Sequence, residues 1–256
     1  MNYQFNIRKR PQGGGSDMVF GIRAVMEALN AGKEIDKIWI RKNLEGDLSR
    51  ELSEVLKGYE IPVQRVPQEK LMHLSSKNHQ GVVAFISPIT YQRLDQLIPA
   101  LYDQGIMPFV VVLDGITDVR NFGAIARTCA CAGVHAVVLP QTGSVSVNAD
   151  AIKTSAGALY HLPVCRERNL KESLRFLKLS GLKLIGASEK ADKNYRDADY
   201  SGPLALVLGA EDQGIAPMHL TLCDEIVKIP VLGDIASLNV SVAGGILMYE
   251  ALRHRD

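Results

Sequence analysis

Side chains that could do chemistry lie in three segments, each of which follows a predicted strand. The first, residues 119–134, reads VRNFGAIARTCACAGV, and Arg127 falls off the apolar helical stripe of its neighbours. A guanidinium among small and apolar residues needs an anionic or hydrogen-bonding partner, and its planar donors suit phosphate or carboxylate. Asn121 stands where a helix N-cap is wanted, so it could cap the helix or bind a ligand. Taken alone, Arg127 could equally be a surface arginine or part of a structural salt bridge.

The second segment, LVLGAEDQGIAP, sets Glu211 between Gly209 and Gly214. Two glycines around a carboxylate permit a tight turn that presents backbone groups to a ligand. The spacing lacks the further glycine of a dinucleotide fingerprint, and Glu211 would repel a pyrophosphate. The loop therefore favours a ligand with a cationic or hydrogen-bond-donating part.

The third segment is IPVLGDIASLNVSVAGGILMYEALRH, in which Ser237 and Asn239 flank Leu238 at the expected start of the last helix. Ser237 is a reasonable N-cap. The helix beyond is apolar nearly all round, so we expect its own domain or a second subunit to bury every side of it. Together the three segments place polar side chains at strand ends of one sheet, which predicts a shared site.

The elements that must position these segments alternate between strand and helix, which predicts an α/β fold with a parallel sheet covered on both faces. Strands are expected at residues 109–114, 135–140, 182–188, 203–209 and 225–230, and helices after the first strand and at 148–159, 170–181 and 238–253. Such sheets bind ligands at the carboxyl ends of their strands, and general rules indicate a doubly wound, nucleotide-binding type.

The chain upstream forms a smaller predicted α/β unit. Helices are expected at residues 19–32, 47–58 and 68–74, and strands at 37–42, 62–66 and 81–86. We predict a flexible basic arm at 1–17, a small α/β domain at 18–88, a linker with one helix at 89–107, and the main domain at 108–256.

Bulk properties exclude several classes of protein. No apolar run is long enough to span a membrane, and the basic N-terminal segment lacks the apolar stretch of a secretory signal. The four cysteines form no C-x-x-C pair, so we expect no zinc, no disulfide framework and a cytoplasmic location. The formal net charge is +1, but residues 1–88 carry 13 Lys and Arg against 10 Asp and Glu, which permits an RNA-facing N-terminal part.

The three segments resemble the motifs of the SpoU (TrmH-type) branch of the SPOUT RNA 2′-O-methyltransferases. NFGAIART resembles the first motif, LVLGAEDQGI the second and IPVLGDIASLNVSVAGGILMYEAL the third, in the order of the family over residues 111–254. Upstream, FGIRAVMEAL and NHQGVVA resemble the small RNA-binding domain of enzymes that methylate a guanosine of 23S ribosomal RNA. The resemblance therefore implies methyl transfer from S-adenosylmethionine to a ribose 2′-hydroxyl of that RNA.

The resemblance also implies a deep trefoil knot in the C-terminal sheet, a homodimer and roles for particular residues. It places Arg127 at the catalytic centre, facing the 2′-hydroxyl and a phosphate, either as a transient base or as a charged group that orients the phosphate. The other expected catalytic residues are Asn121, Glu211, Ser237 and Asn239; the residues around the cofactor are Gly209, Ile229 and Leu238; those that contact RNA are His79 and Arg120.

Three other interpretations remain open from the sequence. The substrate could be a tRNA or a different ribosomal RNA nucleotide, because catalytic motifs specify the reaction while the N-terminal domain selects the RNA. A non-catalytic RNA-binding assembly factor could keep the fold, although Arg127, Asn121 and Asn239 are all present. A nucleotide-dependent dehydrogenase is disfavoured because G-x-G-x-x-G is missing after the first strand of the main domain.

Overall fold

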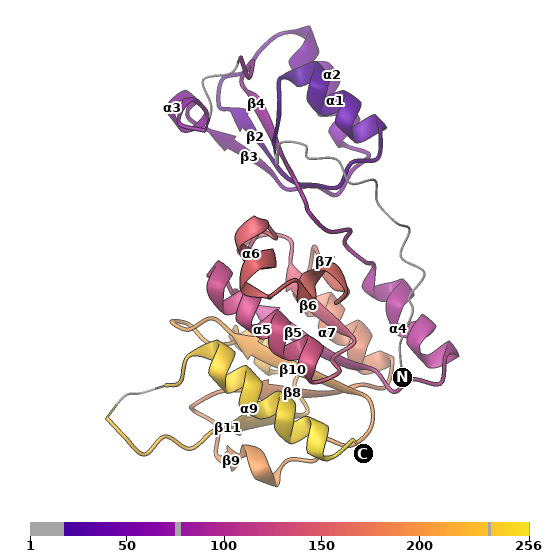
Figure 1. Ribbon diagram of the computed structural model, residues 1–256, viewed down its shortest axis with the longest axis vertical. Coiled ribbons are helices and arrows are strands. Elements are labelled where there is room, and N and C mark those ends of the chain that lie inside the picture. The colour runs from indigo at the N-terminus through magenta and orange to yellow at the C-terminus, as the bar shows by residue number, and fades with distance from the viewer. Residues whose placement is uncertain (1–17, 75–77, 235–236, 256) are drawn as a thin grey trace. The chain divides into compact units, whose positions relative to one another are not determined.

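The computed structural model describes residues 18–74, 78–234 and 237–255, and the predicted arm at 1–17 lies outside them. The chain divides into two compact units, with the boundary between Ile86 and Ser87 (Figure 1). No helix among the described residues has the length and apolar character needed to cross a lipid bilayer.

The first unit is a four-stranded mixed sheet with helices over both faces. Its strand order is β1-β4-β2-β3, in which β2 runs antiparallel to β4 and parallel to β3. The strands are β1 (Met18–Phe20), β2 (Ile35–Arg41), β3 (Val63–Val66) and β4 (Val82–Ile86), and the helices are α1 (Ile22–Asn30), α2 (Asp47–Leu56) and α3 (Gln68–Met72).

The predicted helix at 19–32 begins too early. Val19 and Phe20 belong to β1, which pairs with β4, and the helix starts only after Gly21. Gly21 has φ of 93°, a conformation that few other residues adopt, and it allows the chain to leave the strand and enter α1 at once.

The second unit is a seven-stranded, wholly parallel sheet, so the predicted α/β class is confirmed. The strand order is β7-β6-β5-β10-β8-β11-β9. The strands are β5 (Phe109–Asp114), β6 (Ala136–Pro140), β7 (Val164–Glu167), β8 (Lys183–Ala187), β9 (Lys193–Asn194), β10 (Leu204–Gly209) and β11 (Glu225–Lys228). The α-helices are α4 (Leu94–Asp103), α5 (Val119–Cys131), α6 (Ala149–Thr154), α7 (Leu170–Leu179), α8 (Pro217–Leu220) and α9 (Val240–Arg253), and the 3₁₀ helices are η1 (Ala158–Tyr160) and η2 (Tyr195–Asp197).

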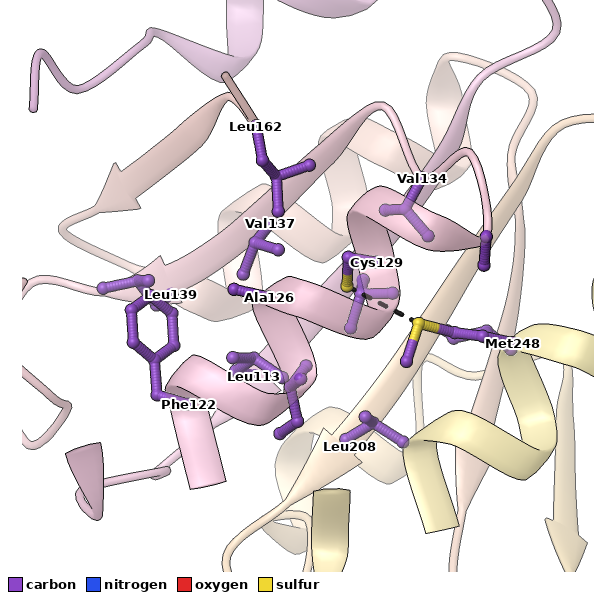
Figure 2. Close-up of a cluster of buried hydrophobic side chains, with 14 of the residues drawn as sticks. Leu113, Phe122, Ala126, Cys129, Val134, Val137, Leu139, Leu162, Leu208 and Met248 are labelled. Atoms are coloured by element: carbon purple, nitrogen blue, oxygen red, sulfur yellow. Dashed lines mark hydrogen bonds between the residues drawn. The ribbon is translucent and has the colours of Figure 1, made fainter. Parts of the chain in front are cut away.

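Each face of the large sheet has its own core, because successive side chains of a strand point to opposite sides. Val111 and Leu113 of β5 pack with α5 and α9, whereas Val110 and Val112 pack with α4 and α7. Figure 2 shows the first of these cores, where the buried Cys129 Sγ of α5 lies 3.5 Å from Met248 Sδ of α9. This packing holds α5 and α9, which carry two of the predicted motifs, against the same sheet.

The segment predicted as a linker is part of the second unit. Residues 94–103 form α4, whose leucine and isoleucine side chains are buried in the core shared with α7. The strand β7 was not predicted, and the helix expected at 148–159 is interrupted. Ala156 and Gly157 have positive φ values of 52° and 82°, which end α6 before η1 begins. The deep trefoil knot stays a prediction.

Candidate active site

The first and second motifs begin side by side at the carboxyl edge of the large sheet. β5 ends at Asp114 and β10 ends at Gly209, and these two residues are paired in the parallel ladder. The loops that follow therefore leave the sheet together, as the general rule for ligand sites in parallel sheets requires.

The start of α5 differs from the prediction for Asn121. The N-cap is Asp118, whose Oδ1 accepts hydrogen bonds from the backbone nitrogens of Arg120 at 2.8 Å and Asn121 at 2.9 Å. A carboxylate at this position also complements the partial positive charge of the helix N-terminus. Since Asp118 caps the helix, the amide of Asn121 is available for another contact.

That amide joins a cluster that connects all three motifs. Asn121 Nδ2 donates to Glu211 Oε1 at 2.8 Å, and Asn239 Nδ2 donates to the same oxygen at 2.6 Å. Asn239 Nδ2 also lies 2.9 Å from Asn121 Oδ1. We call Asn121, Glu211 and Asn239 the amide–carboxylate cluster. It brings together three of the five predicted catalytic residues, and both amide donors that reach Glu211 use Oε1.

Asn239 has a second role that the sequence analysis assigned to Ser237. Its Oδ1 accepts from the backbone nitrogen of Ser241 at 3.0 Å, so Asn239 is the N-cap of α9. Ser237 lies before the cap and is exposed. The oxygen of Asn239 thus fixes the start of α9 while its nitrogen holds Glu211, which ties the position of the cluster to the helix.

The loop that carries Glu211 is held by its own backbone and by contacts to the buried side chain of Asp114. Gly214 N donates to Ala210 O at 2.8 Å, which closes a tight turn. Asp114 Oδ2 accepts from the backbone nitrogen of Ala216 at 2.8 Å and from His219 Nδ1 at 2.7 Å. The side chains of Asp114 and His219 are only 13% and 10% exposed.

The supporting role of Asp114 and His219 was missed in the sequence analysis. A carboxylate at the end of an otherwise apolar buried strand was the available signal, because a buried charge requires partners. His219 gave no signal, since its partner lies more than a hundred residues away in the chain.

A pocket of about 100 Å³ opens beside the amide–carboxylate cluster. Its lining includes the three residues predicted to surround the cofactor, Gly209, Ile229 and Leu238, and also Glu211 and Ser237. Apolar walls come from Leu208, Val227 and Ala243, and a second carboxylate, that of Glu189, reaches the same pocket. The apolar walls and the carboxylates of the pocket suit a ligand with an apolar part and a cationic part better than an anionic ligand.

Arg127 is not bonded to the amide–carboxylate cluster in the described part of the chain. Its side chain is exposed on α5 and, within the described part of the chain, forms no hydrogen bond or ion pair. Glu211 Oε1 instead accepts from the amides of Asn121 and Asn239. An exposed guanidinium stays charged and remains available to an anionic substrate.

The two predicted RNA contacts lie in different units. Arg120 is exposed on α5 beside a hollow that also includes Asp150 and Lys153. His79, in the first unit, uses Nδ1 to accept a hydrogen bond from Gly81 N at 3.0 Å. The imidazole therefore stabilises the turn before β4.

Among the residues that the structure describes, no three His, Cys, Asp or Glu side chains are grouped to hold a metal ion. Burial raises the pKa of the Cys129 and Cys165 thiols well above their usual range, so neither is suited to act as a thiolate nucleophile.

The fold and the site define an α/β enzyme with a ligand pocket at the carboxyl edge of a parallel sheet. The chain belongs to the SpoU rRNA Methylase family, whose family model matches residues 108–249. Residues 18–92 match a second family model, described as RNA 2′-O ribose methyltransferase substrate binding. The protein is therefore an RNA 2′-O-ribose methyltransferase, and RNA is its partner.

Individual relatives agree with this assignment. A putative TrmH family tRNA/rRNA methyltransferase of Bacillus subtilis, YacO, is 36% identical over 94% of this chain and 96% of its own length. The structure of the SpoU methyltransferase AviRb from Streptomyces viridochromogenes in complex with the cofactor AdoMet has a TM-score of 0.57 at 25% identity, and the alignment covers 92% of this chain and 89% of AviRb. The TrmH/SpoU tRNA modifying enzyme of A. aeolicus has a TM-score of 0.53 at 29% identity, over 63% of this chain and 83% of its own.

Proposed function

We propose that this protein transfers a methyl group from S-adenosylmethionine to the ribose 2′-hydroxyl of a guanosine in 23S ribosomal RNA. The observation that carries the proposal is the amide–carboxylate cluster, which unites the three motifs beside a pocket lined by Gly209, Ile229 and Leu238.

Ribosomal RNA is favoured over tRNA by the extent of the similarity. The family model that matches the second unit is described as the SpoU rRNA Methylase family, and the model that matches the first unit is described as substrate binding. The alignment with the A. aeolicus tRNA modifying enzyme covers 63% of the chain, whereas that with the rRNA methyltransferase from Sinorhizobium meliloti covers 93%. A shared catalytic unit accounts for the reaction, and the additional N-terminal unit is available to select a larger RNA.

S-adenosylmethionine is the cofactor, and it supplies an electrophilic methyl group on a sulfonium cation. The lining of the pocket suits such a molecule, because apolar walls match an adenine ring and the carboxylates of Glu211 and Glu189 favour a cation. Gly209, Ile229 and Leu238 would hold it, and the loop around Gly209 offers backbone groups for hydrogen bonds. Asn121 and Asn239 keep Glu211 in one orientation by donating to Oε1.

Arg127 would act on the RNA. Because its guanidinium is exposed and charged, it can pair with a phosphate next to the target ribose and fix the 2′-hydroxyl in position. The same charge would stabilise the negative charge that develops on the 2′-oxygen during the reaction. In this role the proton of the hydroxyl leaves to solvent or to the phosphate, and Arg127 keeps its own.

We further propose that the protein is a homodimer. On α9, Val242 is 51% exposed and Tyr249 53% exposed, and Leu238 just before the helix is 39% exposed. A second copy placed on this apolar surface would bury it and would account for a helix with so little polar character.

The test is transfer of a labelled methyl group from S-adenosylmethionine to unmodified 23S ribosomal RNA and, separately, to unmodified tRNA. The modified nucleoside is identified by mass spectrometry, for the wild type and for Arg127→Ala. The matched control is Arg175→Ala, which removes a half-exposed arginine from α7 on the other face of the sheet. Methylated guanosine from ribosomal RNA alone, lost in Arg127→Ala and kept in Arg175→Ala, supports the proposal.

Other outcomes contradict particular parts of it. Label on tRNA alone would retain the reaction and overturn the substrate. Equal activity of Arg127→Ala would remove Arg127 from the catalytic centre. Cofactor binding without label on either RNA would exclude free RNA as the substrate, and a pre-ribosomal particle would be tested next.

A further inference from the structure

One face of the sheet in the first unit carries a row of basic and aromatic side chains. On β2, Ile38 and Ile40 are buried in the core beneath α1 and α2. Because side chains alternate along a strand, Lys37, Trp39 and Arg41 lie on the opposite face, where Trp39 packs near α3. We call these three residues the β2 row.

Ammonium groups converge on the aromatic rings of this face. Lys70 Nζ, from α3, lies 4.4 Å from the centre of the Trp39 ring, and Lys37 Nζ lies 5.6 Å from it. Lys37 Nζ is also 4.9 Å from the centre of the Phe85 ring, which meets Trp39 edge to face at 4.9 Å. Two positive charges near one indole repel each other, so an anion that binds between them would be stabilised by both.

The β2 row also holds hydrogen-bond donors without acceptors. Trp39 Nε1 and Arg41 Nε are buried and have no acceptor among the described residues. Arg41 Nη1 reaches Gln68 Oε1 only at a long 3.4 Å. Buried donors are almost always paired, so this face favours a ligand that brings acceptors. Phosphate oxygens and base carbonyl groups are such acceptors.

We infer that the β2 row, with Lys70 and Phe85, binds a single-stranded segment of the substrate RNA. Basic side chains that follow a backbone, interleaved with aromatic rings, are the recurring chemistry of single-strand binding. Lys37 and Lys70 take a backbone phosphate, and Arg41 takes an acceptor of the adjoining nucleotide. The inference rests on the proposed function only in taking RNA as the occupant.

Trp39 is the only tryptophan of the chain, which makes its fluorescence a reporter for this face. The full chain is titrated with unmodified 23S ribosomal RNA and with unmodified tRNA while the emission of Trp39 is recorded. Binding at the β2 row changes this emission. Filter binding over a series of salt concentrations measures the affinity in parallel.

The variant is Lys37→Gln combined with Lys70→Gln, and the matched control is Arg50→Gln combined with Lys57→Gln. The control removes the same charge from exposed positions at α2, which packs on the other face of the sheet. We expect the first double variant to bind RNA about tenfold or more weakly, with a log–log salt slope smaller by about 1.4, as for two lost contacts to single-stranded phosphates. The RNA affinity of the control variant should stay within about twofold of the wild type, because Arg50 and Lys57 contribute only non-specific electrostatic attraction.

A structural role of the lysines is tested separately. Both double variants should bind S-adenosylmethionine and melt like the wild type. For Lys37→Gln with Lys70→Gln, saturating RNA should restore the methyl-transfer rate, so that only the KM for RNA rises. Trp39→Phe, which keeps an aromatic ring, should retain more affinity than Trp39→Leu.

The outcomes separate this inference from the proposed function. Equal affinity of the two double variants, or RNA binding with unchanged Trp39 emission, overturns the β2 row as an RNA site, whatever RNA is methylated. If neither RNA accepts a methyl group but the emission change occurs and is lost in Lys37→Gln with Lys70→Gln, the proposed function fails and the binding surface stands.

Discussion

Gly209 is the residue whose replacement should most directly disturb the candidate site. A Cβ at this position would lie 2.0 Å from the backbone carbon of Gly214 and 2.1 Å from the nitrogen of Ile215. Both are backbone atoms, so no side-chain rotation can relieve the clash, and in Gly209→Ala the loop must move away from β10. The movement breaks the Gly214–Ala210 bond and strains the Ala216–Asp114 bond.

The expected loss of stability follows from these contacts. Two hydrogen bonds at about 1 kcal/mol each amount to about 2 kcal/mol, within the range of about 1–3 kcal/mol for overpacking. For a chain of this size, the loss lowers the thermal midpoint by about 4–8 °C. Activity should fall further, by about 100-fold, because Glu211 is carried by the displaced loop and misplacement by about 1 Å has that effect on catalysis.

Three measurements check this prediction: the thermal midpoint, the affinity for S-adenosylmethionine and the rate of methyl transfer to RNA. Gly58→Ala is the matched control, since a Cβ there meets only Val55 O at 3.5 Å, an ordinary contact. The control should change stability by less than about 0.5 kcal/mol. A Gly209→Ala protein with the midpoint and rate of the wild type would refute the argument that the close approach of the two backbones positions the site.

Further predictions concern the support of the site, the pH dependence of stability and the reactivity of the thiols. Asp114→Asn weakens the acceptor of Ala216 N and His219 Nδ1, so it should raise the KM for S-adenosylmethionine about tenfold while the KM for RNA stays constant. Steady-state kinetics with each substrate varied measure both values. An equal effect on the two KM values would contradict a role of Asp114 through the loop. Burial, together with the nearby Arg255 cation, lowers the pKa of His135 in the folded chain. The unfolded chain therefore binds a proton at higher pH than the folded chain, and stability is lost as the pH falls through about 6.5. Urea midpoints at about pH 7.5 and 5.5 should therefore differ less in His135→Gln than in the wild type, and an unchanged difference would exclude His135 as a source. Cys131 is exposed while burial raises the pKa of Cys223 to about 11, so a thiol reagent should modify Cys131 first, and Cys131→Ser should remove the fast phase of the reaction.

The sequence was sufficient for the fold class because the periods of its apolar residues are clear. The continuous run at 109–114 and the alternation around Trp39 correspond to β5 and β2, and α5 and α7 lie where they were expected. The strand β7 was missed because its apolar part is only Val164 and Cys165 before two charged residues. The helix in the segment predicted as a linker was expected, but its burial was not, because α4 packs on a core that belongs to residues far away in the chain.

Three residues of the candidate site were predictable from the sequence, but their contacts were not. Strand-end position and side-chain type indicated Asn121, Glu211 and Asn239, and the structure brings them together. The caps were assigned three residues late at α5 and two residues early at α9, because Asp118 and Asn121, like Ser237 and Asn239, are all of types that can cap a helix. Sequence cannot rank such neighbours, since each has the oxygen that a cap requires.

The hydrogen bond between Asn239 and Asn121 joins residues 118 positions apart in the chain, and this spacing has a consequence during synthesis. At ordinary translation rates, the ribosome adds those residues over a time on the order of ten seconds. During that interval α5 and its arginine are already made, whereas Glu211 is added 90 residues after Asn121 and then lacks the Asn239 donor until a further 28 residues have been added. The amide–carboxylate cluster is therefore complete only when α9 has been made and Asn239 has docked against Glu211.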